Sequence, residues 1–92
     1  MISLDLVKLY LRIDGNDEDI LLNDFIEFSK EEIENSTGVK FNPKGNSSTY
    51  KLAQMMIVTD RYENRGSQDL GFKANNSLSG LYTKLKYGGN DE

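Results

Sequence analysis

Residues 48–66, with the sequence STYKLAQMMIVTDRYENRG, contain the most apolar run of the chain. Within residues 52–58, Gln54 is the one polar side chain. At about 100° per residue, the apolar residues cover most of a helix circumference, while Gln54, Arg61 and Arg65 form one narrow polar stripe. The segment therefore predicts a long central helix that other helices cover on several sides. The apolar run is far too short to span a membrane.

Capping residues are present at both ends of this central helix and at the start of a first helix near the N-terminus. Ser47 or Ser48 suits the N-cap of the central helix, and Gly66 suits the left-handed residue just beyond it. Ser3 suits the N-cap of a first helix over residues 4–11. The apolar residues that share one face of that first helix are Leu6, Leu9 and Tyr10.

A second amphipathic helix is predicted to start at Asn16 or Asp17 and to end at Gly38. The turn chemistry of residues 12–16 precedes it, and acidic residues at positions 17–19 favour the positive end of the helix dipole. Its apolar stripe comprises Leu22, Phe25, Ile26, Ser29 and Ile33. The opposite face carries Asp24, Glu27, Glu31 and Glu34, which we call the acidic stripe.

The rest of the chain predicts two loops and a last helix. Residues 39–47 form a loop in which Phe41 reaches the core, and residues 67–76 form another loop, anchored by Leu70 and Phe72. The last helix starts near Asn76 or Ser77, and the residues at helical spacing are Leu78, Leu81, Tyr82 and Leu85. We expect an all-α fold, a compact bundle of about four helices in a single domain over residues 1–87, with a flexible C-terminal tail over residues 88–92.

Composition narrows the possible functions. The net charge of -4 gives the chain as a whole no electrostatic reason to bind nucleic acid or an anionic membrane. The sequence has no cysteine and no histidine, which removes disulfides, thiolate chemistry, the usual general base and the commonest metal ligand. We therefore expect no enzyme, no catalytic residue, no cofactor and no metal. The N-terminus lacks a signal-peptide pattern, so a cytoplasmic location is expected.

Residues 14–19, DGNDED, superficially resemble a calcium-binding loop. Counted from Asp14, the required glycine at the sixth position is Asp19 and the bidentate glutamate at the twelfth is Phe25. A turn followed by an acidic helix start is the better interpretation.

The acidic stripe and Asp60 each allow two interpretations. The stripe is either a solvated helix face or a surface for a basic partner or metal. Asp60 projects on an apolar side of the central helix, so it needs a partner such as Arg12, Arg61 or Arg65. Alternatively, Arg61 and Arg65 bind carboxylates of a neighbouring subunit. A hydrolase would need a carboxylate pair, for which Asp60 with Glu63 is the only hint.

The C-terminal segment is locally basic. Lys73, Lys84 and Lys86 lie among Tyr82 and Tyr87, a combination that can contact nucleic acid, but three lysines beside an acidic tail are few. The alternative function is a small DNA-binding or regulatory protein of helix-turn-helix type, although neither the second nor the third helix offers a basic surface.

Four segments together resemble the head-tail connector, or neck adaptor, proteins of tailed bacteriophages: residues 6–14 (LVKLYLRID), 17–22 (DEDILL), 33–38 (IENSTG) and 57–66 (IVTDRYENRG). In that family a Leu-Arg-hydrophobic-Asp segment precedes an acidic helix start, Thr-Gly ends that helix, and Tyr-Glu-Asn-Arg closes a buried one. The residues on these motifs are Arg12, Asp14, Tyr62, Glu63, Asn64 and Arg65, of which Tyr62 and Arg65 are expected to be structural.

The resemblance implies a virion structural protein that assembles as a homo-oligomeric ring of about twelve copies beneath the portal protein. The ring would extend the DNA channel, lie close to DNA without sequence specificity and join the portal to the stopper or tail-completion protein. It implies a place in the virion neck, host cytoplasm during assembly, and no membrane. The residues expected to make contacts are Asp24, Glu27, Glu31, Glu34, Arg61, Lys73, Lys84 and Lys86. In a ring, the acidic stripe could line the channel wall, where it would give phosphates nothing to grip.

Overall fold

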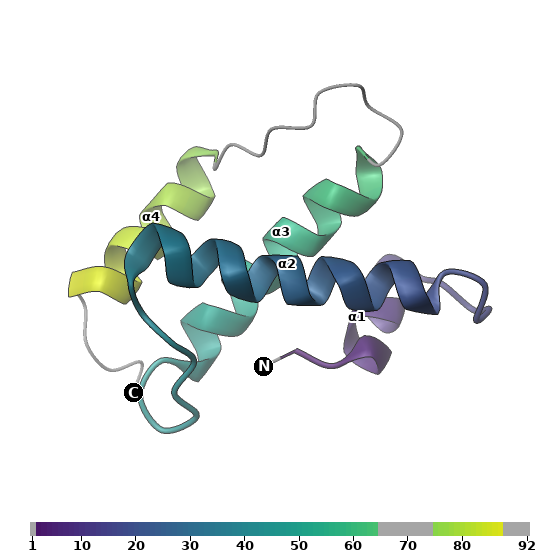
Figure 1. Ribbon diagram of the computed structural model, residues 1–92, viewed down its shortest axis with the longest axis horizontal. Coiled ribbons are helices and arrows are strands. Elements are labelled where there is room, and N and C mark those ends of the chain that lie inside the picture. The colour runs from purple at the N-terminus through teal and green to yellow at the C-terminus, as the bar shows by residue number, and fades with distance from the viewer. Residues whose placement is uncertain (1, 65–74, 88–92) are drawn as a thin grey trace.

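The computed structural model describes residues 2–64 and 75–87. Within these ranges the chain forms four helices joined by loops. They are α1 (Leu4–Leu11), α2 (Asp19–Thr37), α3 (Ser47–Glu63) and α4 (Asn76–Tyr87). Helix α3 contacts each of the others, whereas α1 and α4 do not touch one another. In Figure 1, α2 crosses α3, with α1 and α4 toward opposite ends of the bundle. The predicted all-α bundle around a central helix is confirmed.

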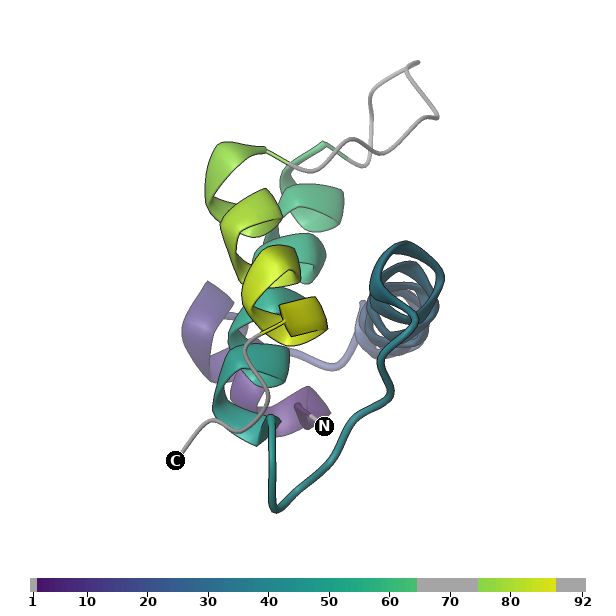
Figure 2. The same cartoon turned by 90° about the vertical axis from the view of Figure 1, so that its left-hand side faces the viewer.

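The hydrophobic core has two parts that lie on different sides of α3. Figure 2, with α2 viewed nearly end on, shows α2 on one side of α3 and the α2–α3 loop passing below to connect them. One part of the core gathers α1, α2 and the middle of α3; its buried members are Ile2, Val7, Leu22, Ile26, Met55 and Val58. The other gathers α2, α3 and α4; its buried members are Ile33, Tyr50, Ala53, Ile57, Leu78 and Leu85.

The polar stripe predicted along α3 does not face solvent at Gln54. This side chain is fully buried, and it accepts a hydrogen bond from the backbone N–H of Ile2 (3.2 Å) and donates one to Ser29 Oγ (3.0 Å). Leu52, in contrast, is 54% exposed. The expected cover on several sides is confirmed, since α1, α2 and α4 all contact α3, but it does not extend to Leu52.

Two predicted helix starts need correction. Asn46, rather than Ser47 or Ser48, occupies the N-cap of α3, and its side chain holds the loop instead of the helix, with bonds to the N–H of Asn42 (2.7 Å) and the C=O of Lys40 (3.0 Å).

Helix α2 starts at Asp19, because the preceding residues form a turn closed by a bond from the N–H of Asp19 to the C=O of Asn16 (3.2 Å). The start predicted at Asn16 or Asp17 is two to three residues early.

Other local predictions are confirmed. Ser3 Oγ accepts the N–H of Leu6 at 3.1 Å, and Gly38 ends α2 in the left-handed region with φ 74°. Helix α4 starts at Asn76, and Phe41 packs edge-on against the Tyr50 ring with centroids 5.3 Å apart. Gly66, Leu70, Phe72 and the tail over residues 88–92 lie outside the described residues.

Helix α1 buries the side opposite to its predicted apolar face. Val7 is completely buried, whereas Leu6, Leu9 and Tyr10 are 43%, 76% and 62% exposed. The helix is apolar on both sides, and only one side can lie against α2 and α3. Packing therefore leaves three large apolar side chains of α1 in solvent.

Candidate functional site

The acidic stripe occupies the outward face of α2. Asp24, Glu27 and Glu31 are exposed, and Glu34 is half-buried. Glu34 turns toward the start of α3, where its negative charge acts on Tyr50. Burial and then this charge raise the pKa of the Tyr50 hydroxyl to about 12. The stripe thus offers three carboxylates to a partner and uses the fourth within the fold.

Glu32, a neighbour of the stripe, joins α2 to α4. Its carboxylate accepts hydrogen bonds from the hydroxyls of Tyr82 (2.9 Å) and Ser36 (2.6 Å). Burial, followed by this contact with Glu32, raises the pKa of the Tyr82 hydroxyl above its ordinary value. Sequence reasoning did not single out Glu32, because nothing in its spacing distinguishes it from the other acids of α2.

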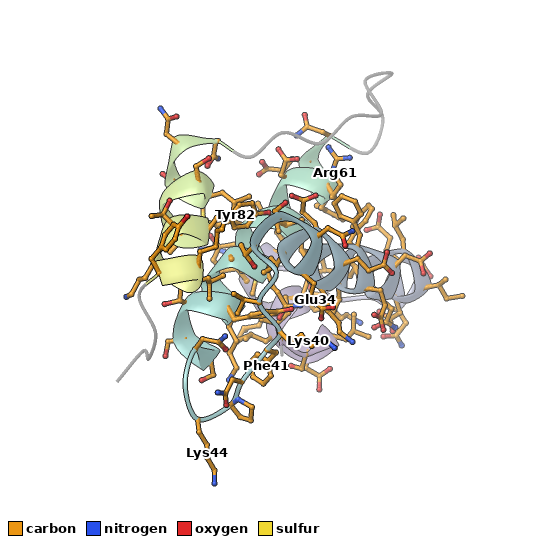
Figure 3. All side chains as sticks on the ribbon, turned by 60° about the vertical axis from the view of Figure 1, so that its left-hand side comes forward. Glu34, Lys40, Phe41, Lys44, Arg61 and Tyr82 are labelled. Atoms are coloured by element: carbon orange, nitrogen blue, oxygen red, sulfur yellow. The ribbon has the colours of Figure 1, made fainter. Side chains whose placement is uncertain are left out.

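Arg61 lies between two partners within the fold. Its guanidinium approaches Asp60 at 3.2 Å and lies 5.7 Å from the centre of the Phe28 ring. Figure 3 shows it on α3 beside α2. Asn64 also donates from Nδ2 to Asp60, at the backbone C=O (2.9 Å) and at Oδ1 (3.2 Å). Asp60 therefore has partners inside the subunit. Of the three arginines proposed for it, Arg61 pairs with it, and Arg65 lies outside the described residues. A contact from Arg61 to another subunit stays a prediction.

A shallow pocket of about 230 Å³ lies where α1, the end of α3 and the residue before α4 meet. Asp60 and Glu63, the pair that hinted at a hydrolase, both line it, as do Tyr10 and Thr59. The hydroxyl of Thr59 is buried and finds no hydrogen-bond partner among the described residues. Because the carboxylate of Asp60 bonds to Arg61 and Asn64, it stabilises the C-terminal end of α3.

The motif residues that carry the connector resemblance have clear local geometry. Arg12 adopts the left-handed conformation (φ 59°) beyond α1, and the N–H of Ile13 bonds back to the C=O of Lys8 at 2.9 Å. This is a Schellman ending, in which the hydrophobic residue after the left-handed one packs against the core. The Leu-Arg-hydrophobic part of the motif therefore describes how α1 stops.

The second motif ties the end of α3 to the start of α2. Tyr62 donates its hydroxyl to Glu18 at 2.9 Å, across 44 residues of sequence. Glu63 is exposed and Arg65 lies outside the described residues, as does Lys73. Asp14, in the turn before α2, is exposed. Any further role of these residues in assembly stays a prediction.

The last turn of α4 presents its cations to solvent. Lys84 and Lys86 are exposed, and the ammonium of Lys86 lies 5.6 Å from the centre of the Tyr87 ring. Neither α2, with acids on its outward face, nor the largely buried α3 offers the basic surface of a DNA-recognition helix.

The structure reveals exposed apolar residues that the sequence did not identify. Leu9, Ile20 and Tyr87 are 76%, 80% and 78% exposed. Amphipathic patterns cannot separate such residues from core residues, because α1 is apolar on two sides and Ile20 directly precedes the buried stripe of α2. Single exposed apolar side chains are normal on protein surfaces, and contiguous patches of them mark binding surfaces.

None of the helices within residues 2–64 and 75–87 combines the length and the apolar composition of a membrane span. Within the same ranges, no three acidic side chains come together as a group that could hold a metal ion.

Comparison with known proteins gives one match. The profile of a family described as Phage gp6-like head-tail connector protein matches residues 1–86. No curated protein and no solved structure matches the chain.

Proposed function

The chain belongs to the Phage gp6-like head-tail connector family, and we propose that it assembles as a ring of about twelve copies beneath the portal of a tailed phage. The ring extends the DNA channel and joins the capsid vertex to the stopper or tail-completion protein. The observation that carries this proposal is the family match over residues 1–86, which includes all four helices. Under this proposal the protein resides in the neck of the virion, after synthesis in the host cytoplasm.

The surfaces of the subunit support a binding role. Among the described residues, the charged side chains lie outside the core, and several large apolar side chains are in solvent. The exposed members of the acidic stripe are one candidate contact or channel surface, and the C-terminal lysines are another. An acidic channel wall repels the DNA phosphates and lets the duplex slide.

The test is the solution mass of the protein, measured by light scattering over a wide range of concentrations, with and without the portal protein of the same phage. A ring-sized species, alone or only with portal, is the expected result. A protein that stays a monomer or dimer at every concentration and does not bind the portal protein would contradict the proposal. In that case, titration with duplex DNA would test the regulatory alternative.

A DNA channel can be tested separately in the assembled particle. Reversing the charge of Glu27 and Glu31 together is expected to leave the fold intact, because both side chains are exposed. If the stripe lines the channel, the variant ring binds duplex DNA more tightly than the wild-type ring at low salt, and the difference disappears at high salt. Equal DNA binding by both rings would show that the acidic stripe does not line the channel wall.

A further inference from the structure

The subunit is two layers of helices thick along its shortest axis. Figure 2 shows α2 on one side and α1, α3 and α4 together on the other. The outward side of α2 is the front face, and the side of the other three helices that points away from α2 is the back face. These broad faces measure at most roughly 1,000 Å² in projection, from extents of 38 and 28 Å, and they alone reach the 800 Å² or so per partner of a standard stable interface.

The back face carries a contiguous apolar patch across α1 and α3. It lies on the sides of these helices opposite to Lys8 and Gln54, the residues through which they bond to α2. Tyr10 and Met56 line one pocket, so the patch continues from one helix to the other. Its members are Leu6 and Tyr10 on α1 and Leu52 and Met56 on α3.

The front face changes character along α2, which spans the subunit from α1 to α4. Near the start of α2, Asp19 pairs with α1 at 2.8 Å, and the next residue, Ile20, is 80% exposed. Near its end, Glu32 accepts a hydrogen bond from Tyr82 of α4 at 2.9 Å, and the residue before it, Glu31, is exposed. Ile20 and Glu31 are about three turns apart on the same side of the helix. The front face therefore has an apolar residue level with α1 and an acid level with α4.

Lys84 gives the back face a cation on α4. It follows Tyr82, which bonds to α2, by about 200° around the helix, so it points away from α2. It is exposed, and an ammonium has three donors, so Lys84 can bind a carboxylate of a neighbour in addition to any contact within the subunit. Ser77 and Gly80, on the same side of α4, are small and let a neighbouring helix approach closely.

Other charges lie off the path that α2 of a neighbour would take across the back face. Glu63, an exposed acid on the back of α3, is at the end of that helix, which extends beyond α2 in Figure 1. Asp60 is paired with Arg61 at 3.2 Å. The exposed charges that project sideways or from the narrow end formed by the first turn are Asp5, Arg12, Asp14, Asp17, Lys51 and Lys86.

From this match we propose that the front face of one subunit packs on the back face of the next, with Ile20 on the apolar patch of α1 and Glu31 paired with Lys84. Because α2 spans α1 to α4, one displacement along the shortest axis brings both pairs into register. The inference rests on the proposed function, since it assumes that copies of this chain assemble. It names the surfaces that meet, and it assigns Glu31 to a contact between subunits instead of the channel wall.

The thickness of the subunit makes this contact compatible with a DNA channel. Packed helices lie about 8 to 10 Å apart, so a subunit of two layers repeats at roughly 20 Å, and about twelve copies form a ring roughly 75 Å in mean diameter. With the 38 or the 28 Å extent directed at the centre, the opening between backbones is roughly 40 to 50 Å, which admits a DNA duplex. Since the front and back faces differ, the contact repeats from copy to copy and closes into a ring when the rotation permits.

Disulfide trapping tests the register directly, because the chain has no cysteine. Tyr10→Cys combined with Ile20→Cys places the two thiols on opposite broad faces, beyond the limit of about 7 Å between Cα atoms for a bond within one subunit. Mild oxidation of the assembled protein, with portal where assembly requires it, is expected to give a ladder of covalent oligomers on a non-reducing gel. Each single variant is expected to give no ladder.

A control pair and a charge swap complete the test. Lys44→Cys with Ile20→Cys is expected to give no ladder, because Lys44 projects from the tip of its loop, away from the helices (Figure 3). Glu31→Lys or Lys84→Glu alone is expected to weaken association about tenfold, since each brings like charges together, and the two combined in one chain are expected to restore it. Asp17→Lys, with the same net charge as Glu31→Lys but at the narrow end, is expected to assemble like the wild type. Circular dichroism checks that every variant keeps its helix content.

The outcomes distinguish this inference from the proposed function. If the wild type assembles but the Tyr10 and Ile20 pair gives no ladder, or the combined charge swap does not restore association, the contact between broad faces is wrong while the ring stands. An equal ladder from the Lys44 control would also overturn the inference. If the wild type forms no oligomer with or without portal, both proposals fall.

Discussion

The side-chain amide of Gln54 donates a hydrogen bond to Ser29 Oγ across 3.0 Å, so that α3 and α2 are joined by a polar contact in the interior of the bundle. Both side chains are completely buried. Ser29 in turn donates to the C=O of Ile26 at 2.6 Å, and Gln54 accepts from the N–H of Ile2 at 3.2 Å. The small network therefore connects the N-terminus, α2 and α3, and each member depends on the others for its partners.

Replacing Gln54 by Ala is expected to lower the free energy of unfolding by about 2 to 3 kcal/mol, because it leaves a cavity and a buried N–H of Ile2 without its acceptor. Gln54→Leu combined with Ser29→Ala should cost less, since an apolar side chain then fills the space. Urea unfolding of the single and double variants measures both values. A double variant less stable than Gln54→Ala would contradict this account of the network.

Tyr50→Phe is expected to stabilise the protein by about 1 kcal/mol. The hydroxyl of Tyr50 is buried without a hydrogen-bond partner among the described residues, so its removal relieves a desolvation cost. The ring stays in place against Phe41. Thermal and urea unfolding at neutral pH give the comparison, and a clear loss of stability in the variant would show that the hydroxyl has a partner.

The same substitution at Tyr82 is expected to act in the opposite direction. Tyr82→Phe removes the bond from the hydroxyl to Glu32 (2.9 Å) that ties α4 to α2, and should cost about 1 to 2 kcal/mol. Tyr87→Phe is the matched control, because Tyr87 is 78% exposed. Equal stability of the Tyr82 and Tyr87 variants would mean that the bond to Glu32 contributes nothing.

Stability is expected to decline at alkaline pH as the tyrosines titrate. The pKa of Tyr50 is raised from 10 to about 12 in the folded protein, so the unfolded chain releases this proton first. The free energy of unfolding is therefore unaffected by this proton below pH 10 and falls as the pH rises from 10 to about 12. Unfolding free energies of the wild type and Tyr50→Phe across this range isolate the effect, which the variant should lack. If the unfolding free energies of the two proteins change with pH in parallel, the titration of Tyr50 does not contribute to the decline.

Two glycines should respond to Ala with opposite signs. Gly38 has a positive φ of 74° and an open space around it, so Gly38→Ala should cost about 1 kcal/mol through backbone strain alone. Gly80 lies inside α4, also with open space, and Gly80→Ala should add about 0.5 to 1 kcal/mol. Melting temperatures of the two variants, recorded together, check the signs. A stabilising Gly38→Ala would contradict the left-handed ending of α2.

Local chemistry made the helices predictable. Helix caps and apolar spacing depend on residues within a turn or two of one another. Ser3 therefore identified the start of α1, Gly38 the end of α2, and the apolar stripe the buried face of α2, without tertiary information. The order of short motifs along the chain also identified the connector family, which the match over residues 1–86 confirms. The starts of α2 and α3 were predicted at the wrong residues, because the side chains of Asp19 and Asn46 serve an ion pair and a loop instead of the helix end.

Tertiary structure alone decided which side chains are buried. The sequence by itself determined an all-helical chain with a long apolar central segment and an acidic outer face on α2. It could not determine that Gln54 lies in the core, or that Leu9 and Ile20 remain in solvent, since burial depends on which helix covers which side. The bonds from Tyr62 to Glu18 and from Tyr82 to Glu32 are likewise a consequence of how four helices fold back on one another, because each joins residues far apart along the chain.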